Sequence, residues 1–173
     1  FWHNSYINLE SGPQLTSGLL KPVRIVYDSS WVPHIYAQSE EDLYFAQGFV
    51  TARDRLWQME LQSYAAAGRA SELVGEKAIA HDREFRRLGM VYAAETSVSE
   101  IEKDPEIKSA CDAYTAGVNA YIHSLSRSSL PIEYKLLDMV PEEWSNLKSA
   151  LFLKYMSFDL SGHENDFEMT AAM

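Results

Sequence analysis

Between residues 22 and 37 apolar and polar positions alternate in two short runs. The first run, Val23–Asp28, is rich in β-branched residues, and the second, Val32–Ala37, follows after a pair of serines. Runs of this kind bounded by turn residues are typical of β-strands. Pro33 has no backbone N–H to donate to a sheet, which favours a short or edge strand. The pattern therefore predicts a β-hairpin.

A helical period replaces this alternation from residue 39 onward. Ser39 and Asp42 approximate the spacing of a capping box, and acidic residues in the first turn suit the positive end of a helix dipole. Apolar residues then recur along one face over four turns, at Phe45, Phe49, Ala52, Leu56 and Met59. We expect Gly68 to end this helix, and shorter helical elements to follow at Ser71–Val74 and Asp82–Leu88.

The second half of the chain has a further helix start at Asp104, where Pro105 takes the first helical position. A second apolar stripe follows, made of Ile107, Cys111, Tyr114, Val118, Tyr121 and Leu125. Residues 130–141 are expected to form a connector. The last helix is predicted from about Leu147, and its apolar residues lie on more than one face, so we expect it to be largely enclosed. The chain has too little predicted sheet for a complete α+β domain.

Composition restricts the class of protein. The 173 residues are 46% hydrophobic and 12% aromatic, which indicates a folded chain with a sizeable core. The formal net charge of −10 argues against non-specific binding to nucleic acid or to an anionic membrane surface. Cys111 is the single cysteine, so the chain forms no internal disulfide.

Candidate catalytic residues are scarce. The histidines have no metal-ligand spacing, and the sequence contains no G-x-S-x-G turn and no phosphate-binding glycine loop. His34 is more consistent with a structural role in its strand. Cys111 lies on an apolar helical stripe, which favours a buried, inert thiol. As a free-standing enzyme the chain has no visible catalytic apparatus.

The segment from residue 22 to residue 89 carries many spaced residues that together form one motif series. They are Asp28, Val32 to Ile35, Asp42, Gly48, Ala52 to Leu56, Gln58 to Glu60, Gly68, Arg69, Glu72, Leu73, Gly75 and Asp82. Their order resembles the chain that precedes the nucleophile in the penicillin acylase (penicillin amidase) family, which are N-terminal-nucleophile (Ntn) hydrolases. The resemblance is sparse from 90 to 130 and resumes at Pro131, at Pro141–Ser145 and in the last helix.

This resemblance implies an α+β fold in which the present chain, 1–173, is the small (α) chain. It would be mostly helical with a short β-hairpin, and a separate β chain from the same precursor would complete an αββα Ntn-hydrolase sandwich. Within it we expect an irregular start at 1–21, the strand pair and long helix at 22–89, and a helical pocket region at 90–173. Family members are typically periplasmic or secreted, which sets the expected location.

The resemblance also implies a function, namely hydrolysis of the amide of an N-acylated small molecule, of the β-lactam or N-acyl-homoserine-lactone type. The nucleophile would be the N-terminal serine of the partner β chain, with its own α-amine as base. No catalytic residue is then expected in the present chain. The alternative is an inactive relative, or a helical module that only binds or scaffolds.

The last helix supplies the candidate binding residues. Its segment 155–162 resembles the part of the penicillin acylases that lines the acyl-binding pocket, which implies substrate contacts for Met156, Phe158, Asp159 and Leu160. Asp159 stands where the best-studied relatives have an arginine thought to face the carboxylate of the leaving group. An acid there is expected to repel such a carboxylate. The alternative is that these residues are simply core.

An acidic cluster follows at Glu164, Asp166 and Glu168. The family often has a calcium-binding carboxylate here, with most other ligands in the partner chain, which implies a structural Ca²⁺ bound by Asp166 or Glu168. Calcium takes six to eight oxygens, so three carboxylates would not complete a site. Acidic residues at a helix start are the simpler alternative.

Charged residues also mark the middle of the first long helix. The run Arg53-Asp54-Arg55 lies beside the apolar stripe, and Arg69 with Glu72 follows. In isolation these charges suggest a solvated face with local ion pairs. Within the family motif they suggest a buried polar network that fixes this helix against the partner chain.

Overall fold

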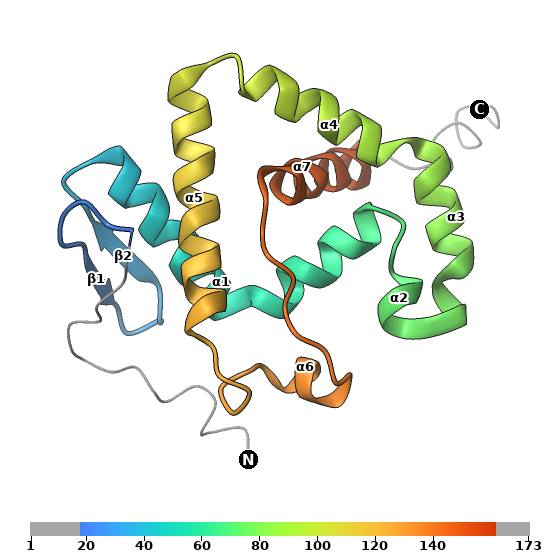
Figure 1. Cartoon of the computed structure of the whole chain (residues 1–173), viewed down its shortest axis with the longest axis horizontal. Coiled ribbons are helices and arrows are strands. Elements are labelled where there is room, and N and C mark those ends of the chain that lie inside the picture. The colour runs from blue at the N-terminus through green and yellow to red at the C-terminus, as the bar shows by residue number, and fades with distance from the viewer. Residues whose placement is uncertain (1–17, 162–173) are drawn as a thin grey trace, which may run out of the picture. The chain divides into compact units, whose positions relative to one another are not determined.

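The computed structural model of the chain describes residues 18–161, which fall into two compact units that interleave along the sequence. The first unit comprises residues up to 60 and 104–144, and the second 61–103 and those from 145 onward. Figure 1 shows a mostly helical chain with one small sheet, as the sequence predicts. In chain order the elements are β1 (Arg24–Tyr27), β2 (Pro33–Tyr36), α1 (Glu40–Ala66), α2 (Ser71–Val74), the 3₁₀ helix η1 (Gly75–Ala78), α3 (Ile79–Leu88), α4 (Met90–Ile101), α5 (Pro105–Ser124), α6 (Ile132–Leu136) and α7 (Asn146–Leu160).

None of the helices within residues 18–161 combines the length and the apolar character needed to cross a membrane.

The predicted hairpin is confirmed, and its turn is held by Asp28. The N–H of Trp31 donates to the backbone oxygen of Asp28 at 3.0 Å, and the Asp28 N–H donates to the oxygen of Val32 at 3.2 Å. The Asp28 carboxylate accepts from the Val32 N–H at 3.0 Å and the Ser30 N–H at 2.8 Å, and lies 3.2 Å from Nε2 of His34. The bond from Val32, then those from His34 and Ser30, hold the pKa of Asp28 below its ordinary value.

The start of α1 is a second anchored point in the first unit. Ser39 Oγ accepts from the Asp42 N–H at 3.2 Å, and the Asp42 carboxylate accepts from Ser39 Oγ at 2.8 Å. The same carboxylate accepts the N–H groups of Leu20 at 2.7 Å and Lys21 at 3.2 Å, which joins the segment before β1 to the helix. Burial alone would raise the pKa of Asp42, but the bonds from Leu20, Ser39 and Lys21 outweigh it and the net pKa is lowered.

Two glycines let α1 and α5 approach each other closely. A methyl group at Gly48 of α1 would lie 2.1 Å from the backbone oxygen of Tyr114. A methyl group at Gly117 of α5 would lie 1.9 Å from the backbone oxygen of Phe45. Both distances are far inside van der Waals contact, so the two helix backbones touch where these glycines stand.

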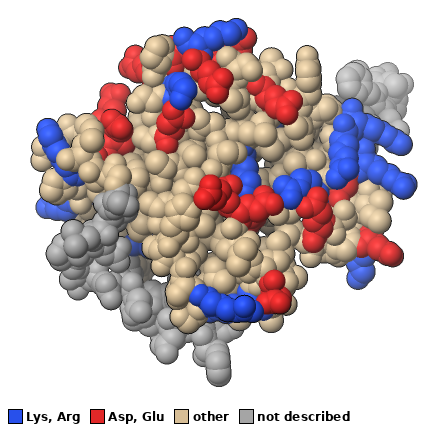
Figure 2. Space-filling view, viewed as in Figure 1, with Lys and Arg blue, Asp and Glu red and all other residues tan. Residues whose placement is uncertain are grey.

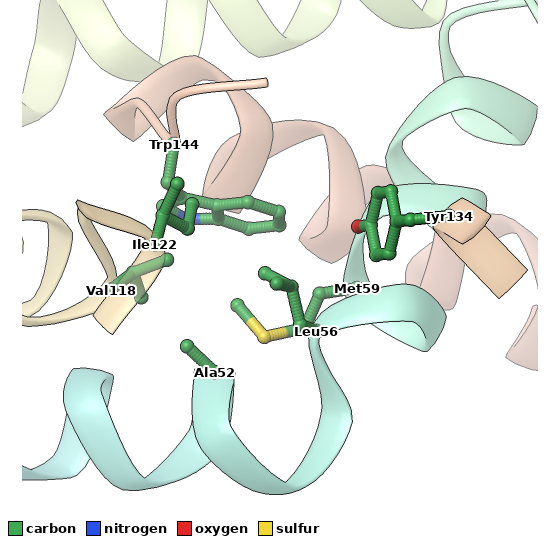
Figure 3. Close-up of a cluster of buried hydrophobic side chains, with 7 residues drawn as sticks. All are labelled: Ala52, Leu56, Met59, Val118, Ile122, Tyr134 and Trp144. Atoms are coloured by element: carbon green, nitrogen blue, oxygen red, sulfur yellow. The ribbon is translucent and has the colours of Figure 1, made fainter. Parts of the chain in front are cut away.

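The core of the first unit lies beside this crossing. Figure 3 shows its buried side chains pointing toward one another: Ala52, Leu56, Met59, Val118, Ile122, Tyr134 and Trp144. Of the predicted α1 stripe, Ala52, Leu56 and Met59 lie in this core, Phe45 is buried as well, and Phe49 is partly buried. Asn119 fixes the chain near Trp144 by donating to its backbone oxygen at 3.0 Å and accepting from its N–H at 2.7 Å.

Helix α6 lies in the region where the sequence predicts only a connector. It is a single short turn, and it forms because Tyr134 is drawn into the core at 0% exposure. The Tyr134 hydroxyl donates to the carboxylate of Glu60 on α1, and the Tyr134 ring packs edge-on against Trp57 with centroids 5.2 Å apart. The same Glu60 carboxylate accepts from the N–H of Glu142 at 2.8 Å. One buried acid thus holds the connector onto α1.

In the second unit α4 packs along α7, as Figure 1 shows. The sequence reading does not predict α4. Its signal is nevertheless present, because Met90, Ala94 and Val98 recur at helical spacing and lie in one cluster with Ala150 and Leu151 of α7. Ala94 is fully buried, and its small side chain lets the two helices pack closely.

Candidate functional site

Helix α7 carries the candidate site, and its two faces differ. The helix begins after Ser145, whose Oγ accepts from the Lys148 N–H at 3.4 Å. On one face Ala150 and Leu151 are buried against α4. On another face three apolar side chains share helical spacing and remain exposed: Leu153 at 58%, Met156 at 42% and Leu160 at 77%. The expectation that α7 is largely enclosed is therefore wrong within residues 18–161, because none of these residues buries the face that carries Leu153, Met156 and Leu160.

The four predicted substrate-binding residues do not lie together. Met156 and Leu160 belong to the exposed apolar face, and Asp159 is exposed beside Leu160. Phe158 turns the other way and packs edge-on against Phe85 of α3, with ring centroids 5.7 Å apart. The structure thus separates one phenylalanine that supports α7 from three residues that α7 presents outward. Their roles in substrate binding stay predictions.

Phe85 is a supporting residue that the sequence reading missed. Its ring stacks on Tyr155 of α7, with centroids 5.7 Å apart and planes inclined by 29°, and contacts Phe158 on the same helix. On its other side His81 stacks on Phe85 at 4.1 Å. Because Phe85 is 8% exposed, α3 supports α7 through an aromatic cluster. A signal for this role was present in the sequence, because Phe85 follows Asp82 by three residues and therefore lies on the same face of the short helix.

A tight turn fixes α3 in its place, and the residues of the family motif build it. The Asp82 carboxylate accepts the N–H groups of Ala70 and Ser71, both at 2.8 Å, and the hydroxyl of Ser71. Arg86 Nε donates to the backbone oxygen of Gly68 at 2.8 Å. Gly68 has φ +65° and a methyl group there would lie 2.7 Å from the backbone oxygen of Asp82, so both its conformation and its surroundings require glycine.

The electrostatics of this turn favour an ionised Asp82. Burial of the carboxylate raises its pKa, but the hydrogen bonds from Ser71, then from Ala70, outweigh burial and hold the pKa below its ordinary value of 3.8. The outer side of α3 carries the exposed Arg83, Arg86 and Arg87. Figure 2 shows basic side chains gathered on that side of the second unit. Helix α3 therefore buries Asp82 and Phe85, while Arg83, Glu84 and Arg87 are exposed and Arg86 reaches back to Gly68.

The charged run on α1 is exposed rather than buried within the described chain. Arg53 lies over the Tyr27 ring, 4.9 Å from its centroid, and donates to the Tyr27 hydroxyl. Arg53 also pairs with Asp54 at 3.3 Å, with side-chain exposures of 27% and 40%. Here the solvated-face interpretation fits, and a role against a partner chain stays a prediction.

Arg69 and Glu72 form a second ion pair of this kind, in the second unit. Arg69 pairs bidentately with Glu72, at 3.0 Å and 2.8 Å, and lies over the ring of Tyr64. Both side chains remain at least one-third exposed.

No catalytic or metal-binding constellation stands out among residues 18–161. They hold no cluster of three or more metal-ligating side chains. His34 and His123 bond carboxylates, of Asp28 and Glu143, at 3.2 Å and 3.0 Å. Burial, and next the charge of Asp112, raise the pKa of Cys111 and disfavour its thiolate. The predicted calcium ligands Asp166 and Glu168 lie outside the described residues.

One hollow of about 470 Å³ lies between the beginnings of α1 and α5. Its charged lining residues are Glu41, Lys108 and Asp112, of which the last two form an ion pair. It belongs to the first unit and contains none of the predicted substrate-binding residues, so it is not the predicted acyl pocket.

Comparison with known proteins finds relatives over most of the chain. Residues 22–173 match the penicillin amidase family. Penicillin acylase 2 proenzyme from Pseudomonas sp. (strain SE83) is 45% identical over 144 residues, which are 83% of this chain and 18% of that protein. Acyl-homoserine lactone acylase QuiP from Pseudomonas aeruginosa is 34% identical over 151 residues, and penicillin G acylase from Escherichia coli is 28% identical over 142 residues. These cover 87% and 80% of this chain, and 18% and 16% of the two relatives.

A solved structure shares the fold. The thermostable penicillin G acylase from Alcaligenes faecalis matches with a TM-score of 0.73 at 24% identity, over 91% of this chain and 81% of the matched chain. The present chain therefore spans less than a fifth of its curated relatives, yet its length is comparable to that of one chain of the solved structure. Because residues 22–173 match the family pattern, the chain belongs to the penicillin amidase family.

Proposed function

We propose that this chain is the small (α) chain of a two-chain amidohydrolase, made by cleavage of a longer precursor. The enzyme would hydrolyse the amide of an N-acylated small molecule, with the N-terminal serine of the partner β chain as nucleophile and its α-amine as base. The partner chain would also complete the αββα sandwich. A periplasmic or secreted location goes with this proposal.

The lengths of the relatives support two chains. The 45% identical relative is named a proenzyme and is more than five times as long as the matched segment. The matched chain of the Alcaligenes structure is short, whereas the Escherichia coli penicillin G acylase is about six times the segment it shares. One internal cleavage of a long precursor would produce a short chain of this length together with a second, longer one.

The exposed apolar face of α7 is the single observation that carries the proposal for this chain. Leu153, Met156 and Leu160 lie in water in this chain, although exposing apolar side chains of this size is unfavourable by about 1.5–3 kcal/mol each relative to full burial. Phe85 braces the helix from behind. A rigid apolar helix face suits one wall of a pocket for an acyl group, whose remaining walls would come from the partner chain.

Expression of the whole precursor gene and intact mass spectrometry test this proposal directly. A second chain that begins with serine, together with hydrolysis of N-acyl amides, would support it. Serine replaced by alanine at that position should abolish both cleavage and turnover. A folded protein that neither cleaves itself nor hydrolyses any acyl amide would instead favour the inactive or scaffolding alternative.

Met156→Ala is expected to shift the acyl-chain preference of the complete enzyme. The substitution shortens a half-exposed side chain, so the melting temperature should change little, while kcat/KM for long acyl chains should change about 10-fold relative to short ones. The measurement is kcat/KM across a series of acyl lengths. Leu136→Ala on α6 is the control, since Leu136 is as exposed as Leu160, at 77%, but lies on another helix. An unchanged preference in Met156→Ala would remove α7 from the pocket.

Asp159→Arg is expected to favour leaving groups that carry a carboxylate. Reversing the charge turns repulsion into attraction, which at about 6 Å and a dielectric close to that of water corresponds to about a tenfold change in kcat/KM. The measurement compares two amides with the same acyl group and either a neutral or a carboxylate-bearing amine. Asp159→Asn should give about half of the effect in free energy. Equal ratios in all three proteins would show that Asp159 does not face the leaving group.

For the metal, we propose that Asp166 contributes one oxygen ligand to a structural Ca²⁺ shared with the partner chain, with Glu168 as the next choice. Carboxylate oxygens suit calcium, and the support for the proposal is the acidic residues of this segment and the family resemblance. Chelation of the complete enzyme should lower its melting temperature by several degrees, because a ligand that binds only the native state stabilises it. The shift should be much smaller in Asp166→Ala and unaffected in Glu133→Ala, and a wild type indifferent to chelation would exclude the ion.

A further inference from the structure

Trp31 occupies a turn position that ordinarily requires glycine. The two backbone hydrogen bonds between Asp28 and Trp31 and between Asp28 and Val32 define a three-residue hairpin loop whose last residue adopts the left-handed conformation. Trp31 has φ 62°. This is the glycine position of a G1 bulge, and for a bulky side chain a positive φ is a true outlier. The other non-glycine residue with positive φ within 18–161 is Asp138, a type that tolerates this conformation better.

The described chain does not explain why tryptophan stands there. The Trp31 side chain is 65% exposed, and its one described ring contact is a tilted approach to Tyr27 with centroids 6.4 Å apart. An indole that contributed mainly to the stability of this hairpin would be buried, as Trp144 is at 5%. Outliers of this kind persist only where the surrounding structure holds them in place, and they cluster at functional sites.

Three further apolar side chains of the hairpin are exposed. Val26 is 43% exposed, Val32 50% and Tyr36 54%. Val26 and Tyr36 share one face of the sheet because Val26 pairs with His34 and Tyr36 with Arg24, each two residues apart along its strand. We call Val26, Trp31, Val32 and Tyr36 the hairpin face. This face is not uniformly apolar, because Arg24, Asp28 and His34 lie on it opposite Tyr36, Val32 and Val26. A two-stranded sheet is marginal in water by itself, and exposed apolar side chains interleaved with polar ones are typical of a protein–protein interface.

The outer edge of β1 adds a directional element to this surface. Asp28 and Val32 form a hydrogen-bonded pair, so the alternation of an antiparallel ladder makes Val26 with His34 the next such pair. The backbone groups of Ile25 and Tyr27 then point to the outer edge of β1, where no further strand pairs within residues 18–161. The outer edge of β2 lacks one donor, because Pro33 has no N–H. Strand addition is therefore favoured at β1.

We propose that the polypeptide that follows this chain in its precursor covers the hairpin face, adds a strand to β1 and takes the Trp31 indole as an anchor. This inference rests on the proposed origin of the chain from a longer precursor. The occupant is argued from length, since the segment that matches this chain is only 16–18% of each curated relative and most of each relative lies outside it. The left-handed Trp31 then aims a large aromatic group at that polypeptide.

Oxidative footprinting of the complete protein tests the contact without any substitution. From this chain alone, Trp31 should be oxidised about tenfold faster than Trp144, in line with exposures of 65% and 5%. If the proposal is right, Trp31 in the native complete protein is oxidised as slowly as Trp144, and both become fast in denaturant. Oxidation of native Trp31 at close to its denatured rate would overturn the proposal.

Substitutions separate anchoring from strain. Trp31→Gly suits the left-handed conformation, so the hairpin should still form, but the two chains of the complete protein should dissociate at least about tenfold faster. Trp31→Phe keeps an aromatic group and should recover most of the wild-type dissociation rate. Asp138→Gly is the matched control, because it relieves the other positive φ without removing an aromatic side chain, and it should leave dissociation unchanged. Equal rates in wild type and Trp31→Gly would contradict the anchor.

A photo-crosslinking amino acid in place of Trp31 identifies the occupant. Cross-links to peptides from beyond residue 173 support the proposal, whereas cross-links to residues 1–17 or to a second copy of this chain overturn it. The result is independent of catalysis: a precursor that never cleaves itself contradicts the proposed enzyme, but it can still show Trp31 protected and cross-linked within one polypeptide.

Discussion

Gly117→Ala is expected to lower the free energy of unfolding by about 3 kcal/mol, enough to threaten folding of the first unit. The added methyl group would lie 1.9 Å from the backbone oxygen of Phe45, and that oxygen belongs to a helix that cannot rotate it away. Alanine is the better helix former by about 1 kcal/mol, but this gain is smaller than the cost of separating α1 from α5. Urea unfolding followed by far-UV circular dichroism measures the change.

Two further variants make this expectation specific. Gly48→Ala places a methyl group 2.1 Å from the oxygen of Tyr114 at the same crossing, so the double variant should cost clearly less than the sum of the two single ones. Ser109→Ala is the control for helix propensity, because Ser109 is exposed on the same helix and its substitution should be neutral or slightly stabilising. A Gly117→Ala protein as stable as wild type would mean that the helices do not touch here.

Glu60→Ala is expected to cost about 3–4 kcal/mol of stability. The carboxylate is 2% exposed, and it accepts from the Tyr134 hydroxyl and from the Glu142 N–H at 2.8 Å. Removing a buried acceptor costs about 1–3 kcal/mol of stability for each donor that is left without a partner, and the cavity left by the side chain adds to this cost. Because both donors lie 74 or more residues away in sequence, the connector that contains α6 should loosen from α1. Hydrogen exchange of residues 130–144 measures that loosening.

Glu60→Gln separates the hydrogen bonds from the volume of the side chain. Its amide oxygen can accept from the Glu142 N–H while its amide donates to the Tyr134 hydroxyl, so the loss should be clearly smaller than for alanine. Tyr134→Phe removes the hydroxyl and keeps the packed ring, and its cost should combine non-additively with that of Glu60→Gln. A Glu60→Ala protein with unchanged exchange in 130–144 would place the stability of the connector elsewhere.

Secondary structure could be predicted wherever the chain carries strong periodic or capping signals. The hairpin, α1, α2, α3, α5 and α7 follow from alternation, apolar stripes, the Asp104 cap and terminal glycines, and all are present. The predictions failed where the signal is tertiary. Helix α6 is five residues long and exists because Tyr134 is buried. Helix α4 carries only a short stripe, Met90, Ala94 and Val98, and the small size of Ala94 matters only against α7.

The candidate site divides in the same way. The sequence shows that the candidate residues lie on one helix. They are near neighbours in the chain: Met156, Phe158, Asp159 and Leu160. Which of them point outward depends on where α3 and α4 pack, and Phe85 is what draws Phe158 inward. Sequence reasoning found Asp82 and Gly68 as motif residues but not their physical role, which is to hold the turn that places Phe85.

The sequence by itself determined the family, the hairpin, the long helices and the absence of an evident catalytic set, because spaced motifs and local periodicity are properties of the chain. Only the tertiary structure decided that one face of α7 is apolar and uncovered, that Glu60 holds a distant connector, and that Trp31 adopts a glycine conformation in the open. These are relations between residues far apart in sequence or between a side chain and its cover. No local pattern encodes them, because burial is settled when the elements pack.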